Sequence, residues 1–113
     1  MKQIANIEHK IKIEFESYFL IFQRYNRNNK RTIHIYEHAK TDYMIQIIYL
    51  NSDDKNVMVE MSFVEKIKEY STFNYPNKLI KKSEIKIENE EEILKKFRGY
   101  KREIDLKEIF LKT

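Results

Sequence analysis

The chain has 113 residues, the length of one compact domain, and its 42% hydrophobic content is sufficient for a buried core. The net charge of +4 is compatible with an acidic partner but does not identify one, because net charge bears on association and not on fold. The absence of cysteine excludes disulfides, thiolate nucleophiles and cysteine-ligated zinc, and the single glycine, Gly99, excludes the glycine-rich loops that bind phosphate.

Residues 2–25 carry two overlapping hydrophobic patterns. Their apolar residues recur at helical spacing, whereas residues 10–16 alternate with polar ones as in a strand. We expect a helix over residues 2–16 and then a strand over residues 18–25, because a single strand of more than about fifteen residues would be unusual. The pattern alone leaves open whether residues 2–25 form one helix or a helix and a strand.

The hydrophobic segments are too short for a membrane protein. The longest uninterrupted apolar run, residues 18–22, is far shorter than the roughly 20 residues that span a bilayer. The first ten residues include Gln, Asn, Glu and His, so they lack the apolar region of a signal peptide. We therefore expect a cytoplasmic protein without membrane contact.

Three segments in the middle of the chain have the composition of strands. The turn-forming sequence NRNN precedes the first of them, and HAKTD and NSDDKN connect the three. Residues 43–50 are apolar on both faces, which is typical of a central strand. Residues 57–64 alternate, and we expect their odd-numbered apolar residues to face the core: Val57, Val59, Met61 and Phe63. Consecutive strands with short connections predict an antiparallel meander.

The remaining strand of this group, residues 32–38, also alternates. Ile33 and Ile35 lie on one face and are expected in the core. The other face carries His34, Tyr36 and His38, which we expect to be exposed to solvent.

The C-terminal half begins with an irregular segment, residues 65–82, and a short strand over residues 83–88. Asn89 and Glu92 form a capping-box pattern that predicts a helix, which we expect to end at Gly99. A second cap pattern at Asp105 predicts a further short helix. The predicted fold is α+β: one domain over residues 1–113, with an antiparallel β-meander sheet of 4–5 strands, an N-terminal helix and C-terminal helices packed on one face.

Neither metal binding nor catalysis is indicated. On a strand, His34 and His38 lie about 13 Å apart, whereas two ligands of one zinc ion must each lie about 2 Å from it. Asp53 and Asp54 fall in a turn sequence, where such residues bond the local backbone. No histidine has a neighbouring pattern that implies a catalytic triad, so we expect no enzymatic activity, no metal and no cofactor.

Two basic clusters are candidates for nucleic-acid binding. The first, within residues 24–31, combines cations that can contact phosphate with tyrosines that can stack on bases. The second lies within residues 95–102. The residues that we assign to this alternative site are Arg24, Arg27, Lys30, Arg31, Arg98, Lys101 and Arg102. The competing interpretation is that the first cluster solvates a hairpin tip and the second complements a helix dipole.

Aromatic side chains provide the other candidate surface. Tyr70, Phe73 and Tyr75 are concentrated in a predicted loop, and large amphipathic aromatics dominate interface hot spots. We add Tyr36 and His34, from the strand face expected to be exposed, to this partner-binding site.

These features predict a small interaction protein without catalytic activity. We expect it to bind a host macromolecule, in the first place a protein, as an accessory or inhibitory factor of the kind that phages and mobile elements carry, for example against host defence. The alternative is a nucleic-acid-binding accessory or regulatory protein that uses the two basic clusters. The sequence gives no indication of the oligomeric state.

Overall fold

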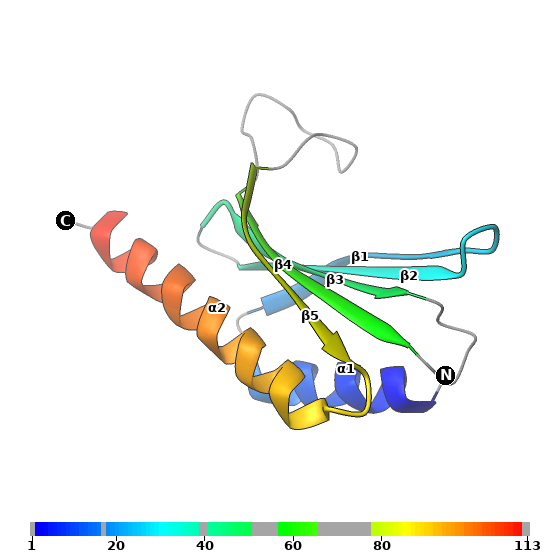
Figure 1. Cartoon of the computed structure of the whole chain (residues 1–113). Helices are drawn as coiled ribbons and strands as arrows, with labels where there is room; N and C mark the ends of the chain where they lie inside the picture. Colours follow the sequence, from blue (N-terminus) through cyan, green and yellow to red (C-terminus); the bar gives the residue numbers. More distant parts are fainter. Residues whose placement is uncertain (1, 17, 39–40, 51–56, 66–77, 112–113) are drawn as a thin grey trace.

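The computed structural model describes residues 2–16, 18–38, 41–50, 57–65 and 78–111 (Figure 1). The elements are, in chain order, α1 (Lys2–Glu14), β1 (Tyr18–Asn26), β2 (Arg31–His38), β3 (Tyr43–Leu50), β4 (Met58–Glu65), β5 (Lys78–Lys86) and α2 (Glu90–Leu111). The first two elements confirm the division of the N-terminal segment into a helix followed by a strand. Among the described residues, no helix combines the length and the apolar composition that crossing a membrane requires.

The strands form one sheet in the order β1-β2-β3-β4-β5, with every neighbouring pair antiparallel (Figure 1). This is the predicted meander, and β3 is the central strand as its apolar sequence indicated. Among the strands that the structure describes, β1 and β5 form the two edges of the sheet. The α+β fold class predicted from the sequence is therefore confirmed.

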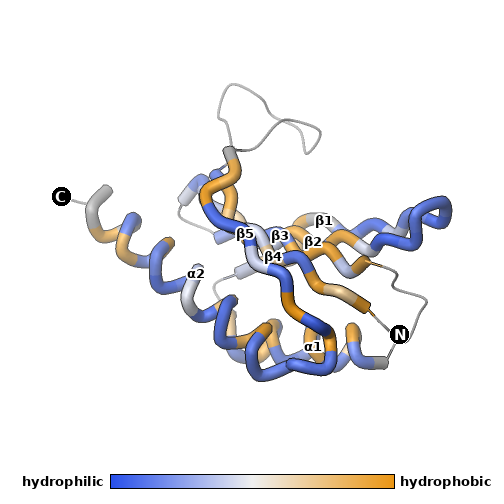
Figure 2. Tube along the Cα trace, viewed as in Figure 1, coloured by the Kyte–Doolittle hydropathy of each residue, from blue (hydrophilic) through white to orange (hydrophobic). Residues whose placement is uncertain are grey.

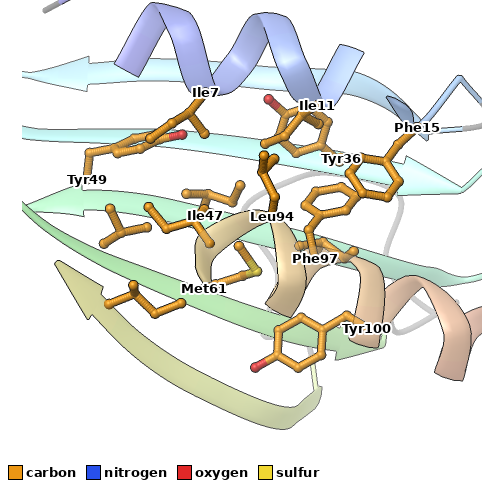
Figure 3. Packing of buried hydrophobic residues seen from close by; sticks show 14 of the residues in the cluster. Ile7, Ile11, Phe15, Tyr36, Ile47, Tyr49, Met61, Leu94, Phe97 and Tyr100 are labelled. Atoms are coloured by element: carbon orange, nitrogen blue, oxygen red, sulfur yellow. The ribbon is translucent and has the colours of Figure 1, made fainter. Parts of the chain in front are cut away.

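Both helices pack on the same face of the sheet and enclose the core (Figures 1 and 3). In α1, Ile4, Ile7 and Ile11 follow the helical period and are buried. The sheet contributes alternate residues from its inner strands, including the predicted Val57, Val59, Met61 and Phe63. Between the helices, the ring of Phe97 lies 4.3 Å from that of Phe15. Packing of the apolar face, more than intrinsic propensity, holds these helices in place.

The helix-facing side of β2 differs from the prediction. His34, Tyr36 and His38 are buried among the core residues, with 2%, 3% and 4% of their surface exposed. Ile35 lies on the opposite face in a separate small cluster with Met44 and Val64. Alternation shows which residues share a face, but β2 has large side chains on both faces, so alternation alone cannot show which face the helices cover.

The helix predicted to end at Gly99 instead continues through it to Leu111, so one C-terminal helix replaces the two expected. Asn89 precedes the helix as predicted, and its carbonyl accepts a hydrogen bond from the Ile93 amide at 3.1 Å. The buried residues Phe97 and Ile104 lie on either side of Gly99 in the chain and on the same helix face. Their burial outweighs the cost of about 1 kcal/mol for a glycine inside a helix.

This position offers a stability test. We expect Gly99→Ala to raise the free energy of unfolding by about 0.5–1 kcal/mol, because alanine restricts the unfolded chain and favours the helix. A Cβ atom at Gly99 would meet no atom within 4 Å. Urea unfolding followed by circular dichroism measures the change, with the exposed Arg102→Ala as the matched control on the same helix. A decrease in stability on Gly99→Ala would contradict a continuous helix at this point.

The turn between β1 and β2 is built by asparagine side chains, as the NRNN sequence predicted. The Asn28 amide donates to Oδ1 of Asn26 at 2.9 Å, and the Arg31 amide donates to Oδ1 of Asn29 at 3.2 Å. Lys30 takes the left-handed conformation, with φ of 53°. The hairpin projects beyond the helices, and its tip is hydrophilic (Figures 1 and 2).

Candidate functional site

A groove of about 1060 Å³ lies between α1 and the helix-facing side of β1 and β2. Ile4 and Glu8 of α1 line it on one side, and Leu20, Tyr25 and Tyr36 of the two strands line it on the other. It is open to solvent and mainly apolar, with a few polar groups. Its volume is slightly above the range of about 300–1,000 Å³ that is usual for ligand pockets.

A bulge in β1 places the groove residues on one face. Leu20 pairs with Tyr36 and Gln23 pairs with His34, and the register shifts between Leu20 and Phe22. Residues directly opposite one another on paired strands share a face, so both pairs point toward α1. In a regular strand, Leu20 and Gln23 would point to opposite faces, because side chains alternate. The extra residue in the bulge thus lets Leu20 and Gln23, which lie on either side of it, both face the groove.

Polar side chains from three elements meet where the groove borders the core. The Tyr49 hydroxyl of β3 donates to Oε1 of Glu8 in α1 at 2.6 Å. Nδ1 of His34 in β2 lies 2.6 Å from the same oxygen. This second contact is close, but the carboxylate is out of line with the ring N–H, so we treat it as an electrostatic contact and not as a well-formed hydrogen bond.

The Tyr49 hydroxyl keeps its proton at neutral pH. Burial, together with the neighbouring Glu8 carboxylate, raises the pKa of the Tyr49 hydroxyl well above its usual value. The hydroxyl therefore remains a donor to Glu8 throughout the neutral range. Because the ring of Tyr49 is fully buried, this hydrogen bond fixes the position of the Glu8 carboxylate at the edge of the core.

Two further polar atoms at the groove have no hydrogen-bond partner among the described residues. They are Nε2 of His34 and the hydroxyl oxygen of Tyr36, and both are buried. Figure 3 shows the Tyr36 ring reaching from β2 toward Ile11 of α1. Buried polar groups in folded proteins nearly always have a partner, so these two atoms mark a place where a ligand group or water belongs.

The rim of the groove is an edge strand with exposed apolar side chains. Within the described part of the chain, no strand pairs with the outer edge of β1. Phe19, Leu20 and Tyr25 of this strand are 54%, 44% and 45% exposed. The opposite edge, β5, also exposes Leu79 and Ile80, but it exposes Lys81, Lys82 and Lys86 as well, and exposed lysines are a usual means of protecting an edge strand from pairing. Residues 18–22 of β1 include no lysine and no other charged residue.

The structure brings together only part of the partner-binding site predicted from the sequence. Tyr36 and His34 line the same groove, but as buried floor residues, so the expectation of an exposed strand face was wrong. Tyr70, Phe73 and Tyr75 lie outside the described residues, as do Asp53 and Asp54. Among the residues that the structure does describe, no group of three or more potential metal-binding side chains occurs.

The two basic clusters lie on different parts of the molecule and differ in their pairing. Arg24, Arg27 and Arg31 are exposed on the projecting hairpin, and the structure records no ion pair for them among the residues it describes. In the second cluster, Arg98 pairs with Glu14 and holds the pKa of that carboxyl below its usual value through the hydrogen bond. The two clusters therefore do not form one continuous basic surface (Figure 1).

Sequence reasoning missed two residues that line the groove, Glu8 and Leu20, and the buried Tyr49 that donates to Glu8. Glu8 looked like a helix-surface residue, and Tyr49 looked like an ordinary residue of a central strand. A signal did exist in the run at residues 18–22, because an edge strand seldom exposes two large apolar residues in succession, as this one exposes Phe19 and Leu20. Recognising it required knowing which strand forms the edge.

The chain has no match among models of protein families, curated proteins or solved structures. Its function must therefore be argued from the geometry of the groove and the adjoining edge strand.

Proposed function

We propose that this chain is a protein-interaction module that binds an extended segment of a partner protein along the outer edge of β1. The observation that carries the proposal is an unprotected edge strand, with Phe19, Leu20 and Tyr25 exposed, directly beside an apolar groove. In this mode of recognition, main-chain hydrogen bonds to the edge supply affinity, and alternate side chains of the added strand enter pockets and supply specificity.

The contrast between the two edges of the sheet supports the choice of β1. Lys82 and Lys86 are exposed on β5, and desolvating several lysines would oppose the addition of a strand there. On β1, an added strand would cover Leu20 and other apolar surface, which favours binding by about 25 cal/mol for each Å² removed from water.

The hairpin tip supports an acidic partner segment. Arg24 lies on β1, and Arg27 and Arg31 lie in or beside the turn that ends it. A segment that follows β1 toward the tip would bring its own side chains near these guanidinium groups. Acidic residues at that end would speed association and set the direction of the added strand. Holding a segment of a larger protein in this way is how an accessory or inhibitory factor acts.

We expect Leu20→Lys to weaken binding of the segment at least about tenfold, because it removes one buried leucine contact and adds a charge to the edge. The probe is a display library of random segments of nine residues, the length of β1, selected on the wild-type chain. Binding of the selected segments is then measured by fluorescence polarisation.

The matched control is Leu79→Lys, an equally drastic change at a leucine that is 56% exposed on the opposite edge strand. It should leave binding unchanged. Equal losses in both variants, or no loss in Leu20→Lys, would refute the site on β1. A dimer of this chain that forms through β1 and dissociates on Leu20→Lys would show that a second copy occupies the edge, and would also overturn the proposal.

A second candidate function is nucleic-acid binding at the hairpin tip alone. It is favoured by the exposure of Arg24, Arg27 and Arg31 and by the absence of recorded ion pairs for them among the described residues. Binding of this kind would weaken steeply with salt and would not respond to Leu20→Lys. Arginines engaged by phosphate would also lose affinity in similar steps when changed one at a time to alanine.

A further inference from the structure

The floor of the groove contains a pair of buried polar groups that the fold does not satisfy. His34 and Tyr36 are 2% and 3% exposed. Nε2 of His34 and the hydroxyl of Tyr36 have no hydrogen-bond partner within the described chain. Both residues line the groove, so a group bound there could supply the missing partners.

The neighbouring carboxylate indicates which hydrogen-bonding role each group is free to take. Oε1 of Glu8 lies 2.6 Å from Nδ1 of His34, a separation that favours a proton on Nδ1, because two lone pairs would repel at that distance. In the neutral imidazole, Nε2 is then an acceptor. The Tyr36 hydroxyl can donate its own proton. The floor of the groove thus offers one acceptor and one donor.

The spacing of the two groups suits a single ligand atom. His34 and Tyr36 lie on the same face of β2, two residues apart, so their Cα atoms are separated by about 6.7 Å. Side chains at neighbouring positions on one strand face can share one ligand oxygen, with hydrogen bonds of about 2.8 Å. A hydroxyl both donates and accepts, whereas an ammonium has no acceptor and a carboxylate has no donor.

We propose that the groove binds a tyrosine side chain of the partner segment, whose hydroxyl donates to Nε2 of His34 and accepts from the hydroxyl of Tyr36. This inference rests on the proposed function, since the segment on β1 is what presents the side chain. The apolar wall formed by Ile4 and Leu20 suits an aromatic ring, and the groove volume of about 1060 Å³ admits one. The hydroxyls of serine and threonine lie too close to their own backbone to reach the floor from the edge of the sheet.

The test compares p-cresol, which reproduces the tyrosine side chain, with toluene, which reproduces that of phenylalanine. Each is titrated into the full chain, and amide chemical shifts of α1, β1 and β2 are followed by NMR. We expect p-cresol to bind about tenfold more tightly than toluene, because two hydrogen bonds of ordinary net strength give about that ratio.

Tyr36→Phe removes one of the two partners without changing the shape of the ring, and it should reduce the preference for p-cresol to about threefold or less. The control is Tyr25→Phe, which deletes another tyrosine hydroxyl at the groove and should retain the full preference. Thermal unfolding of both variants establishes that they are folded.

Equal affinities for p-cresol and toluene in the wild-type chain would overturn the proposal and would indicate that water occupies the floor. Changes in amide chemical shift that p-cresol causes only in residues outside the groove would overturn the proposal as well. The same measurements separate this proposal from the proposed function. Selected segments that lack tyrosine but lose binding on Leu20→Lys would support recognition along β1 and reject the tyrosine anchor. A preference for p-cresol together with segment binding that Leu20→Lys leaves unchanged would support the tyrosine site and reject recognition along β1.

Discussion

Replacing Phe97 with alanine should lower the free energy of unfolding by about 3–5 kcal/mol, the largest effect that we expect from any single substitution in this chain. Phe97 is fully buried and lies 4.3 Å, centroid to centroid, from the ring of Phe15. Its ring also makes edge contacts with Tyr18 and Tyr36, each at 5.6 Å. One side chain of α2 therefore contacts the residue that follows α1 and residues of β1 and β2. Figure 3 shows its ring beside those of Phe15 and Tyr36.

The size of the effect follows from where the cavity would form. The neighbours of Phe97 lie on β1, on β2 and directly after α1, so they cannot collapse into the space without moving these parts of the chain. A loss of this size is comparable with the whole stability of many domains, which is about 5–15 kcal/mol. We therefore expect a large unfolded fraction at moderate temperature.

Urea unfolding followed by circular dichroism measures this loss, and Phe19→Ala provides a control with the same chemical change. Phe19 is 54% exposed, so its truncation should cost less than about 1 kcal/mol. Similar losses in the two variants would mean that Phe97 does not occupy the junction of the helices and the sheet.

The second large effect concerns the polar cluster below the groove. Glu8→Ala should lower the free energy of unfolding by about 1–3 kcal/mol, because it leaves the buried Tyr49 hydroxyl without its acceptor. The better helix propensity of alanine offsets this loss by only a few tenths of a kcal/mol, as expected from the small difference between glutamate and alanine.

A double variant distinguishes this mechanism from a simple loss of packing. Adding Tyr49→Phe to Glu8→Ala removes the unpaired hydroxyl, so the double variant should be more stable than Glu8→Ala alone. Glu8→Gln retains an acceptor oxygen and should cost less than Glu8→Ala. If Tyr49→Phe instead adds its own full loss to that of Glu8→Ala, the two side chains do not interact as described.

The two predictions also bear on the proposed binding site. The ring of Phe97 makes an edge-to-face contact with the ring of Tyr36, and Glu8 contacts Nδ1 of His34. Both groove-floor residues are therefore held by contacts within the core. A site positioned in this way loses little conformational freedom when it binds, which favours affinity.

Local patterns in the sequence were enough to predict most of the secondary structure. The alternation over residues 57–64, the apolar run at residues 43–50 and the asparagine-rich turn all gave correct elements, because strands and tight turns depend on near neighbours in the chain. The prediction at Gly99 failed because propensity is a weak local term. Burial of Phe97 and Ile104 on one face of α2 outweighed it.

By itself, the sequence determined the α+β class, the order of the strands and the absence of cysteine chemistry and phosphate loops. Only the tertiary structure decided that β1 is an unprotected edge and that the histidine face of β2 lies against the helices. The physical reason is that alternation assigns residues to faces, while coverage of a face depends on where distant helices pack. The groove is likewise formed by Glu8 and residues of β1 and β2, whose proximity no local pattern encodes.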